Sequence, residues 1–126
     1  MPLRTSLRLW VPPLALMAVI FYLSHQPDLS SGLGIIDLVG RKLVHAAEYA
    51  LLCALSWRAL RPAVPPRVAL MASLAVSIAY AVSDEIHQSF VPGRTATPID
   101  VSIDAVGAGL AALIVRRRQR RPAGLG

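Results

Sequence analysis

Two short stretches of the sequence contain most of the residues that can do acid–base or metal chemistry. KLVHAAEY holds Lys42, His45, Glu48 and Tyr49, and SDEIHQSFVPGRTATPID (residues 83–100) holds three carboxylates, a histidine, a glutamine and an arginine. Histidine and carboxylate side chains serve as general acids and bases when they reach a substrate. Arginine and lysine bind phosphate or carboxylate groups, and arginine can do so through two parallel hydrogen bonds. Three interpretations of the second stretch are open: an exposed loop, a set of helix caps, or half of a functional site.

The candidate site residues divide by the chemistry of their side chains. The candidate catalytic acids and bases are His45, Glu85, Asp100 and Asp104. The candidate substrate-binding residues are Lys42, Tyr49, Gln88 and Arg94. Nucleophilic catalysis is disfavoured, because the chain has no G-x-S-x-G motif and its single cysteine, Cys53, lies in an apolar stretch.

A metal ion is an alternative use of the same stretches. His45 with Glu48, and Asp84 with His87, each place two potential ligands three residues apart on one helix face. Mixed nitrogen and oxygen ligands suit zinc, manganese or iron. However, neither pair has the closed spacing of a recognised motif such as H-E-x-x-H. We therefore assign no metal ligand and expect no cofactor.

The segments that carry these residues are strongly apolar. Of 126 residues, 55% are hydrophobic and 16% are charged, which is less charge than a typical soluble domain has. Four apolar segments, at about 9–23, 43–60, 68–82 and 99–115, lie near the short end of the roughly 17–25 residues that cross a hydrocarbon core. A soluble four-helix bundle is the alternative, but no segment has a charged face wide enough for water.

We therefore predict an all-α integral membrane bundle of four transmembrane helices, formed by a single domain over residues 1–126. The predicted spans are 9–24, 42–60, 67–88 and 98–115, followed by a basic tail at 116–126. The first span resembles a signal peptide in its early arginines, but no small-residue cleavage site follows it. An uncleaved first span is the preferred interpretation.

The charges are divided unequally between the two predicted membrane faces. One face combines both termini with the connection between spans two and three. It collects ten basic residues and no acidic one: Arg4, Arg8, Arg58, Arg61, Arg67, Arg116, Arg117, Arg118, Arg120 and Arg121. Since basic loops stay in the cytoplasm, both termini are predicted to be cytoplasmic. The arginine-rich tail is interpreted as a topology anchor that contacts anionic lipid, in preference to a nucleic-acid-binding arm.

Polar side chains form a stripe on each of the two central spans. At about 100° per residue, Arg41, Lys42, His45, Glu48 and Tyr49 fall within an arc of roughly 120°. Glu48 lies about 9 Å deeper than Lys42 along such a helix. A carboxylate at that depth is expected to face protein or a water-filled cavity.

The second stripe lies on the third span and grows denser toward the same membrane face. An arc of about 140° contains Ser73, Ser77, Tyr80, Ser83, Asp84, His87 and Gln88, with Glu85 roughly 60° beyond it. The serines are favoured as helix-packing residues. The helix end at Asp84, Glu85 and His87 is either exposed to water or part of a site.

The fourth span adds two carboxylates to the same face. Asp100 follows Thr97 and Pro98, so it fits both a helix-capping role and a site. Asp104 lies about 6 Å deeper, where no cap requires it. Gly107 and Gly109 on this span favour close helix packing.

These motifs, in this order, resemble the VanZ-like family, which takes its name from a bacterial teicoplanin-resistance protein. The resemblance runs from about Phe21 to Ala111 and rests on FYLSHQP, KLVHAAEY, DEIHQSFVPGR and DVSIDAVGAG. The family pattern carries over onto Lys42, His45, Tyr49, Glu85, Gln88, Pro92, Arg94, Asp100 and Gly107. Asp104 departs from it, because the family usually has asparagine there. The resemblance implies a small bacterial inner-membrane protein linked to low-level resistance to glycopeptide antibiotics, and it implies no particular reaction.

Two classes of function fit these expectations, so whether the chain is an enzyme stays open. An enzyme would use the acids and bases on a lipid-linked cell-wall precursor at the outer membrane face. An accessory or binding protein would use the same network to recognise a lipid, a peptide end or a membrane partner, or to fix helix packing. The expected partners are membrane lipids and no nucleic acid. A transporter of the small multidrug type is disfavoured, because the first span has no carboxylate.

Overall fold

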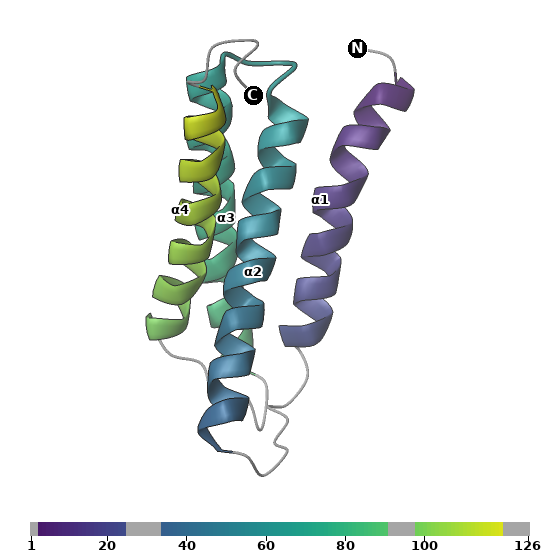
Figure 1. Ribbon diagram of the computed structural model, residues 1–126. Coiled ribbons are helices and arrows are strands. Elements are labelled where there is room, and N and C mark those ends of the chain that lie inside the picture. The colour runs from purple at the N-terminus through teal and green to yellow at the C-terminus, as the bar shows by residue number, and fades with distance from the viewer. Residues whose placement is uncertain (1–2, 25–33, 91–97, 120–126) are drawn as a thin grey trace.

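The computed structural model describes residues 3–24, 34–90 and 98–119, which form four α-helices (Figure 1). The helices are α1 (Leu3–Ser24), α2 (Ile35–Leu60), α3 (Pro66–Gln88) and α4 (Pro98–Gln119). They run lengthwise beside one another and alternate in direction (Figure 1). No strand occurs in the ranges described. The all-α, four-helix prediction is confirmed.

Two of the helices are long and apolar enough to cross a membrane. They are the segments Leu3–Leu23 and Pro66–Gln88. Helices α2 and α4 have 26 and 22 residues, which is also enough for a crossing, but they carry more of the charged side chains. Large apolar side chains are exposed on every helix, for example Leu14, Leu43, Met71 and Val106.

The helix boundaries follow local signals. Helix α3 begins after Pro65 with Pro66 at its first position, where the fixed φ of proline suits a helix start. Helix α2 begins at Ile35, earlier than the span predicted from residue 42, directly after Gly34. Gly34 has a φ of 58°, a left-handed conformation that favours glycine. Helix α4 continues to Gln119 and so includes the first residues of the predicted tail.

Helices α2, α3 and α4 form the tightly packed part of the bundle. Small buried residues let α2 and α4 approach closely: Cys53, Ala108 and Ala112 form one core cluster. A Cβ added at Gly107 would lie 2.9 Å from the Cα of Ala46 and even closer to its carbonyl oxygen. Only glycine therefore fits at this crossing.

Helix α1 packs on the outside of this three-helix unit (Figure 1). Ile20 is buried against Tyr49, Leu52 and Ala81. The Tyr80 hydroxyl donates a hydrogen bond of 2.5 Å to the carbonyl oxygen of Met17. This bond ties α3 to the middle of α1.

Candidate functional site

Three ionisable side chains from three different helices converge at one end of the bundle. His45 of α2, Asp84 of α3 and Asp104 of α4 each offer a ligand atom within 4.8 Å of the other two. Asp84 is 6% exposed and Asp104 is 4% exposed, while His45 is half-buried. We refer to these residues as the three-helix cluster, and to this end of the bundle, where α2 and α4 begin and α3 ends, as the cluster end.

Neighbouring polar groups surround the three-helix cluster. His45 Nδ1 lies 3.9 Å from Asp104 Oδ1 and 3.8 Å from Glu48 Oε2. Gln88 Nε2 donates a 3.1 Å hydrogen bond to Asp84 Oδ2. Three carboxylates therefore lie around one imidazole, and Gln88 hydrogen-bonds one of them, in a part of the bundle that is largely shielded from solvent.

Tyr49 lies inward of the cluster, one helical turn beyond His45. Its side chain is fully buried, and its hydroxyl lies within electrostatic reach of Asp84 and Asp104. Although it lies beside Asp84, this hydroxyl makes no hydrogen bond of good geometry with the described residues. Its ring packs at 6.3 Å from that of Tyr80. Tyr49 thus closes the inner side of the cluster with a polar atom that faces the acids.

The register of the helices brings these side chains together. On α3, the buried residues Ser73, Ser77, Ala81, Asp84 and Gln88 follow one another at spacings of three or four, which is the repeat of a single helix face. The Ser77 hydroxyl donates to the carbonyl oxygen of Ser73, so its polar group is satisfied within the helix. The same buried face therefore runs from apolar packing into the cluster.

On the opposite side, the α2–α4 crossing fixes the distance between His45 and Asp104. Gly107 meets Ala46 at this crossing, and these two residues lie three positions after Asp104 and one position after His45. Close backbone contact here leaves the side chains of His45 and Asp104 facing each other across the interface.

The structure brings together some of the residues expected from the sequence. His45 and Asp104 belong to the three-helix cluster, and Tyr49 and Gln88 border it. Lys42 lies one turn before His45 and is half-buried. Arg94 and the side chain of Asp100 lie outside the described residues.

Glu85 and Asp84 are neighbours in sequence but differ in position. Glu85 is half-buried on α3 and is not one of the three clustered ligands, so its catalytic role stays a prediction. Asp84 was expected on the polar face of the third span and as a metal ligand with His87, but it was not among the candidate catalytic residues. It is nevertheless the α3 member of the cluster, and its place in the arc from Ser73 to Gln88 was the signal that favoured it over Glu85. The His87 ring instead packs 4.4 Å from the ring of Phe21.

A histidine between buried carboxylates can do two kinds of chemistry. It can transfer protons, because imidazole and carboxylate groups act as general acid and base. It can also bind a cation, because buried acidic groups are stabilised by opposite charge. Both uses require access from the cluster end.

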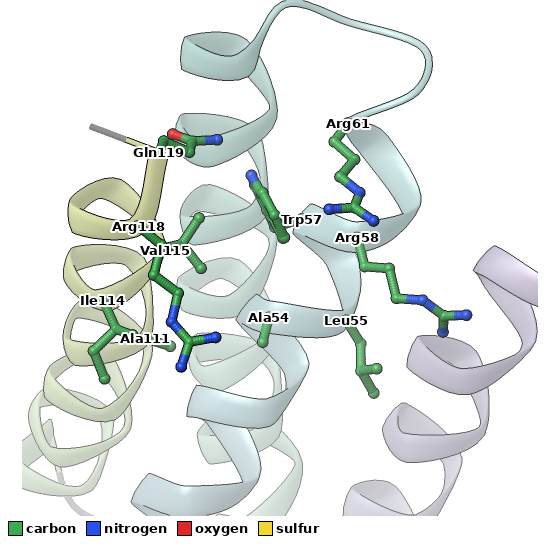
Figure 2. A pocket seen from close by; sticks show the side chains of 10 residues that line it. All are labelled: Ala54, Leu55, Trp57, Arg58, Arg61, Ala111, Ile114, Val115, Arg118 and Gln119. Atoms are coloured by element: carbon green, nitrogen blue, oxygen red, sulfur yellow. The ribbon is translucent and has the colours of Figure 1, made fainter. Parts of the chain in front are cut away.

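A pocket of ≈ 760 Å³ lies toward the opposite end, between α2 and α4 (Figure 2). Apolar side chains line most of it, including Leu55 and Ile114. Arg58, Arg61 and Arg118 contribute the basic groups. This pocket is distinct from the three-helix cluster and has the opposite charge.

Comparison with known proteins gives one match. The chain matches the VanZ/LLP1 family over residues 9–119. This range includes all of α2, α3 and α4, and therefore every member of the three-helix cluster. No curated protein and no solved structure matches the chain. Because the match covers most of its length, the chain belongs to the VanZ/LLP1 family.

Proposed function

We propose that this protein crosses the bacterial cytoplasmic membrane four times and that the three-helix cluster is the core of an outward-facing polar site. This site acts on, or recognises, a lipid-linked substrate of the cell envelope. The observation that carries the proposal is the convergence of His45, Asp84 and Asp104 from three helices. Charged groups inside a membrane bundle are costly and therefore mark functional positions more often than packing positions.

The charge distribution supports the four crossings and their direction. The first turn of α1, the end of α2, the start of α3 and the end of α4 lie at the same end of the bundle (Figure 1), and this end carries the arginines at 4, 8, 58, 61, 67 and 116–118. The positive-inside rule places such an end in the cytoplasm. The cluster end then faces outward, and the exposed apolar side chains of all four helices contact lipid.

The substrate class follows from the chemistry and position of the site. A lipid-linked cell-wall precursor is held in the membrane by its chain and presents phosphate groups at the outer surface. Lys42, at the cluster end, can bind a phosphate, and Arg94 is proposed to assist. His45 with the two aspartates would then lie beneath the bound phosphate. The proposal extends to resistance to glycopeptide antibiotics such as teicoplanin, and the resemblance to the VanZ-like family supports this extension.

The test is a resistance assay in a susceptible bacterium. His45→Gln, Asp84→Asn and Asp104→Asn are compared with the native chain at equal membrane abundance. We expect each to lose the increase in minimal inhibitory concentration of teicoplanin, because each removes one charged member of the cluster. Ser83→Ala is the matched control, because Ser83 lies beside Asp84 on α3 and is exposed. Full resistance in all three cluster variants would contradict the proposal.

A non-catalytic accessory role is the second candidate, because the His45–Asp104 contact also connects α2 with α4. Binding of a polyprenyl-phosphate lipid to the purified protein separates the two. In an enzyme, Asp84→Asn abolishes resistance but leaves lipid binding measurable. In a recognition protein, resistance and lipid binding fall together.

A further inference from the structure

The geometry points to a divalent transition-metal site formed by His45, Asp84 and Asp104. The three ligand atoms lie within 4.8 Å of one another. A point therefore exists that is about 2.8 Å or less from all three atoms, and ordinary metal–ligand bonds of about 2.0–2.2 Å need side-chain adjustments of less than about 1 Å. The helix backbones need not move.

The second observation is the buried hydroxyl of Tyr49. It is fully buried, faces Asp84 and Asp104, and makes no well-formed hydrogen bond with the residues described. Burying a hydroxyl without a partner is unfavourable. A cation held by the two aspartates would carry water, and a water ligand would give this hydroxyl a partner.

The ligand set selects a class of metal. One imidazole nitrogen with two carboxylate oxygens suits zinc, manganese or ferrous iron better than calcium or magnesium, which bind mostly through oxygen. Glu48 Oε2 lies 3.8 Å from His45 Nδ1, close enough to add a further carboxylate ligand, whereas Gln88 donates a hydrogen bond to Asp84. Outer contacts of this kind orient metal ligands.

The site would also have room for a substrate atom. Three protein ligands leave at least one coordination position open in a catalytic metal site, and a phosphate oxygen is a suitable occupant. This use of the metal rests on the proposed function, but metal binding itself is measured without any substrate. A protein that binds the metal and has no effect on resistance would keep this inference and remove the proposed function.

The experiment measures metal content in the full-length protein, purified in detergent through an affinity tag without histidine. The protein is stripped with chelator, incubated with Zn²⁺ or Mn²⁺, dialysed and analysed by inductively coupled plasma mass spectrometry. We expect about one ion per chain, and a loss of about tenfold or more in affinity for His45→Ala, Asp84→Asn and Asp104→Asn.

Matched controls remove the same side-chain types from positions outside the cluster. His87→Ala removes a histidine whose ring packs on Phe21, and Glu85→Gln removes the acid next to Asp84. Both should retain the ion. The inference is overturned if the native protein retains no ion, which is the result expected if Lys42 alone balances the charge of the acids. It is also overturned if the control variants lose the ion as fully as the cluster variants do. Circular dichroism and size-exclusion profiles identify any variant that fails to fold, and the isosteric Asp→Asn changes are the decisive ones.

A separate observation concerns the pocket between α2 and α4. It combines an apolar lining with basic side chains, of which Arg118 extends between α4 and α2 and Arg58 extends toward α1 (Figure 2). The indole nitrogen of Trp57 is buried there and donates no hydrogen bond to any described residue. Arg61 lies over the Trp57 ring, with its guanidinium carbon 4.9 Å from the ring centre. We infer that this pocket binds an anionic membrane phospholipid.

Each part of such a lipid has a counterpart in the pocket. An acyl chain fits the apolar wall that includes Leu55 and Ile114. Arg118, whose guanidinium extends into the space between α4 and α2 (Figure 2), matches the phosphate charge. Basic pockets between membrane helices bind anionic head groups in this way.

Native mass spectrometry after release from nanodiscs tests this inference. With equal parts of phosphatidylglycerol and phosphatidylcholine, we expect preferential retention of phosphatidylglycerol. Arg118→Gln should reduce that preference. Arg67→Gln is the control, because Arg67 lies at the same end on α3 but outside the pocket. Equal retention of both lipids, or an equal effect of the control, would overturn the inference.

Discussion

Gly107 lies at the point where α2 and α4 come closest, so its replacement by alanine tests how the site is assembled. The added Cβ would meet the backbone of Ala46, 2.8 Å from the carbonyl carbon and 2.9 Å from Cα. Backbone atoms in the middle of a helix cannot rotate away as a side chain would. The two helices must therefore separate.

The size of the effect follows from these distances. Ordinary van der Waals contact begins at 3.4 Å, so α2 and α4 would move apart locally by about 1 Å. Overpacking of this kind costs about 1–3 kcal/mol of unfolding free energy. The same movement would widen the 3.9 Å separation between His45 and Asp104, since Asp104 lies one turn from Gly107.

The assay compares thermal unfolding of Gly107→Ala and Gly109→Ala in the same detergent, followed by tryptophan fluorescence. Gly109 is the matched control, because nothing lies within 4 Å of its added Cβ and it is on the same helix. We expect Gly107→Ala to lower Tm and to reduce metal retention. Gly109→Ala should keep or raise Tm, because alanine has the higher helix propensity. If Gly107→Ala is as stable as Gly109→Ala, the close α2–α4 contact and the site geometry derived from it are wrong.

Three further outcomes are expected. Tyr80→Phe should lower the unfolding free energy by about 1 kcal/mol, because it removes the hydrogen bond to Met17. Tyr22→Phe is the control and should leave the unfolding free energy unchanged, because Tyr22 is exposed. Chemical denaturation of both variants measures the difference. Gln88→Leu should weaken metal binding and resistance without loss of the fold, because Gln88 supports Asp84, and a variant with native metal affinity would contradict that role. Cys53 is buried and should react with a maleimide only as the protein unfolds, so rapid labelling of the folded protein would contradict its placement in the core.

The sequence was sufficient to predict the helices, because the helix is the favoured structure of a long apolar run in a small chain. It was less informative at the start of α2, where charged residues and glycines at 34–41 resemble a connection between helices. In the structure α2 begins at Ile35, since Gly34 supplies the left-handed turn before it. A local backbone conformation of that kind leaves only a weak trace in an apolarity pattern.

The site was predictable in part for a similar reason. Helical periodicity gives the angle between side chains of one helix, so His45 and Tyr49 could be placed on one face of α2. Periodicity cannot give the rotation of that helix relative to its neighbours. Asp84 and Glu85 differ by about 100°, and the family pattern favoured Glu85, whereas the packing of α3 directs Asp84 into the cluster. Contacts across helices decide such a choice.

A double replacement, Asp84→Leu with Asp104→Leu, asks whether the cluster exists for stability or for function. Buried charged groups can often be replaced by apolar residues of similar size without loss of stability, and sometimes with a gain of about 1–4 kcal/mol. If the cluster serves function, the double variant should unfold at the native temperature or higher and should lose metal binding and resistance. If the carboxylates mainly hold the helices in register, the variant should unfold at lower temperature with reduced cooperativity. The functional interpretation predicts the first outcome, because Gly107, Ala108 and Ala112 already fix the close packing of α4 without any charged group.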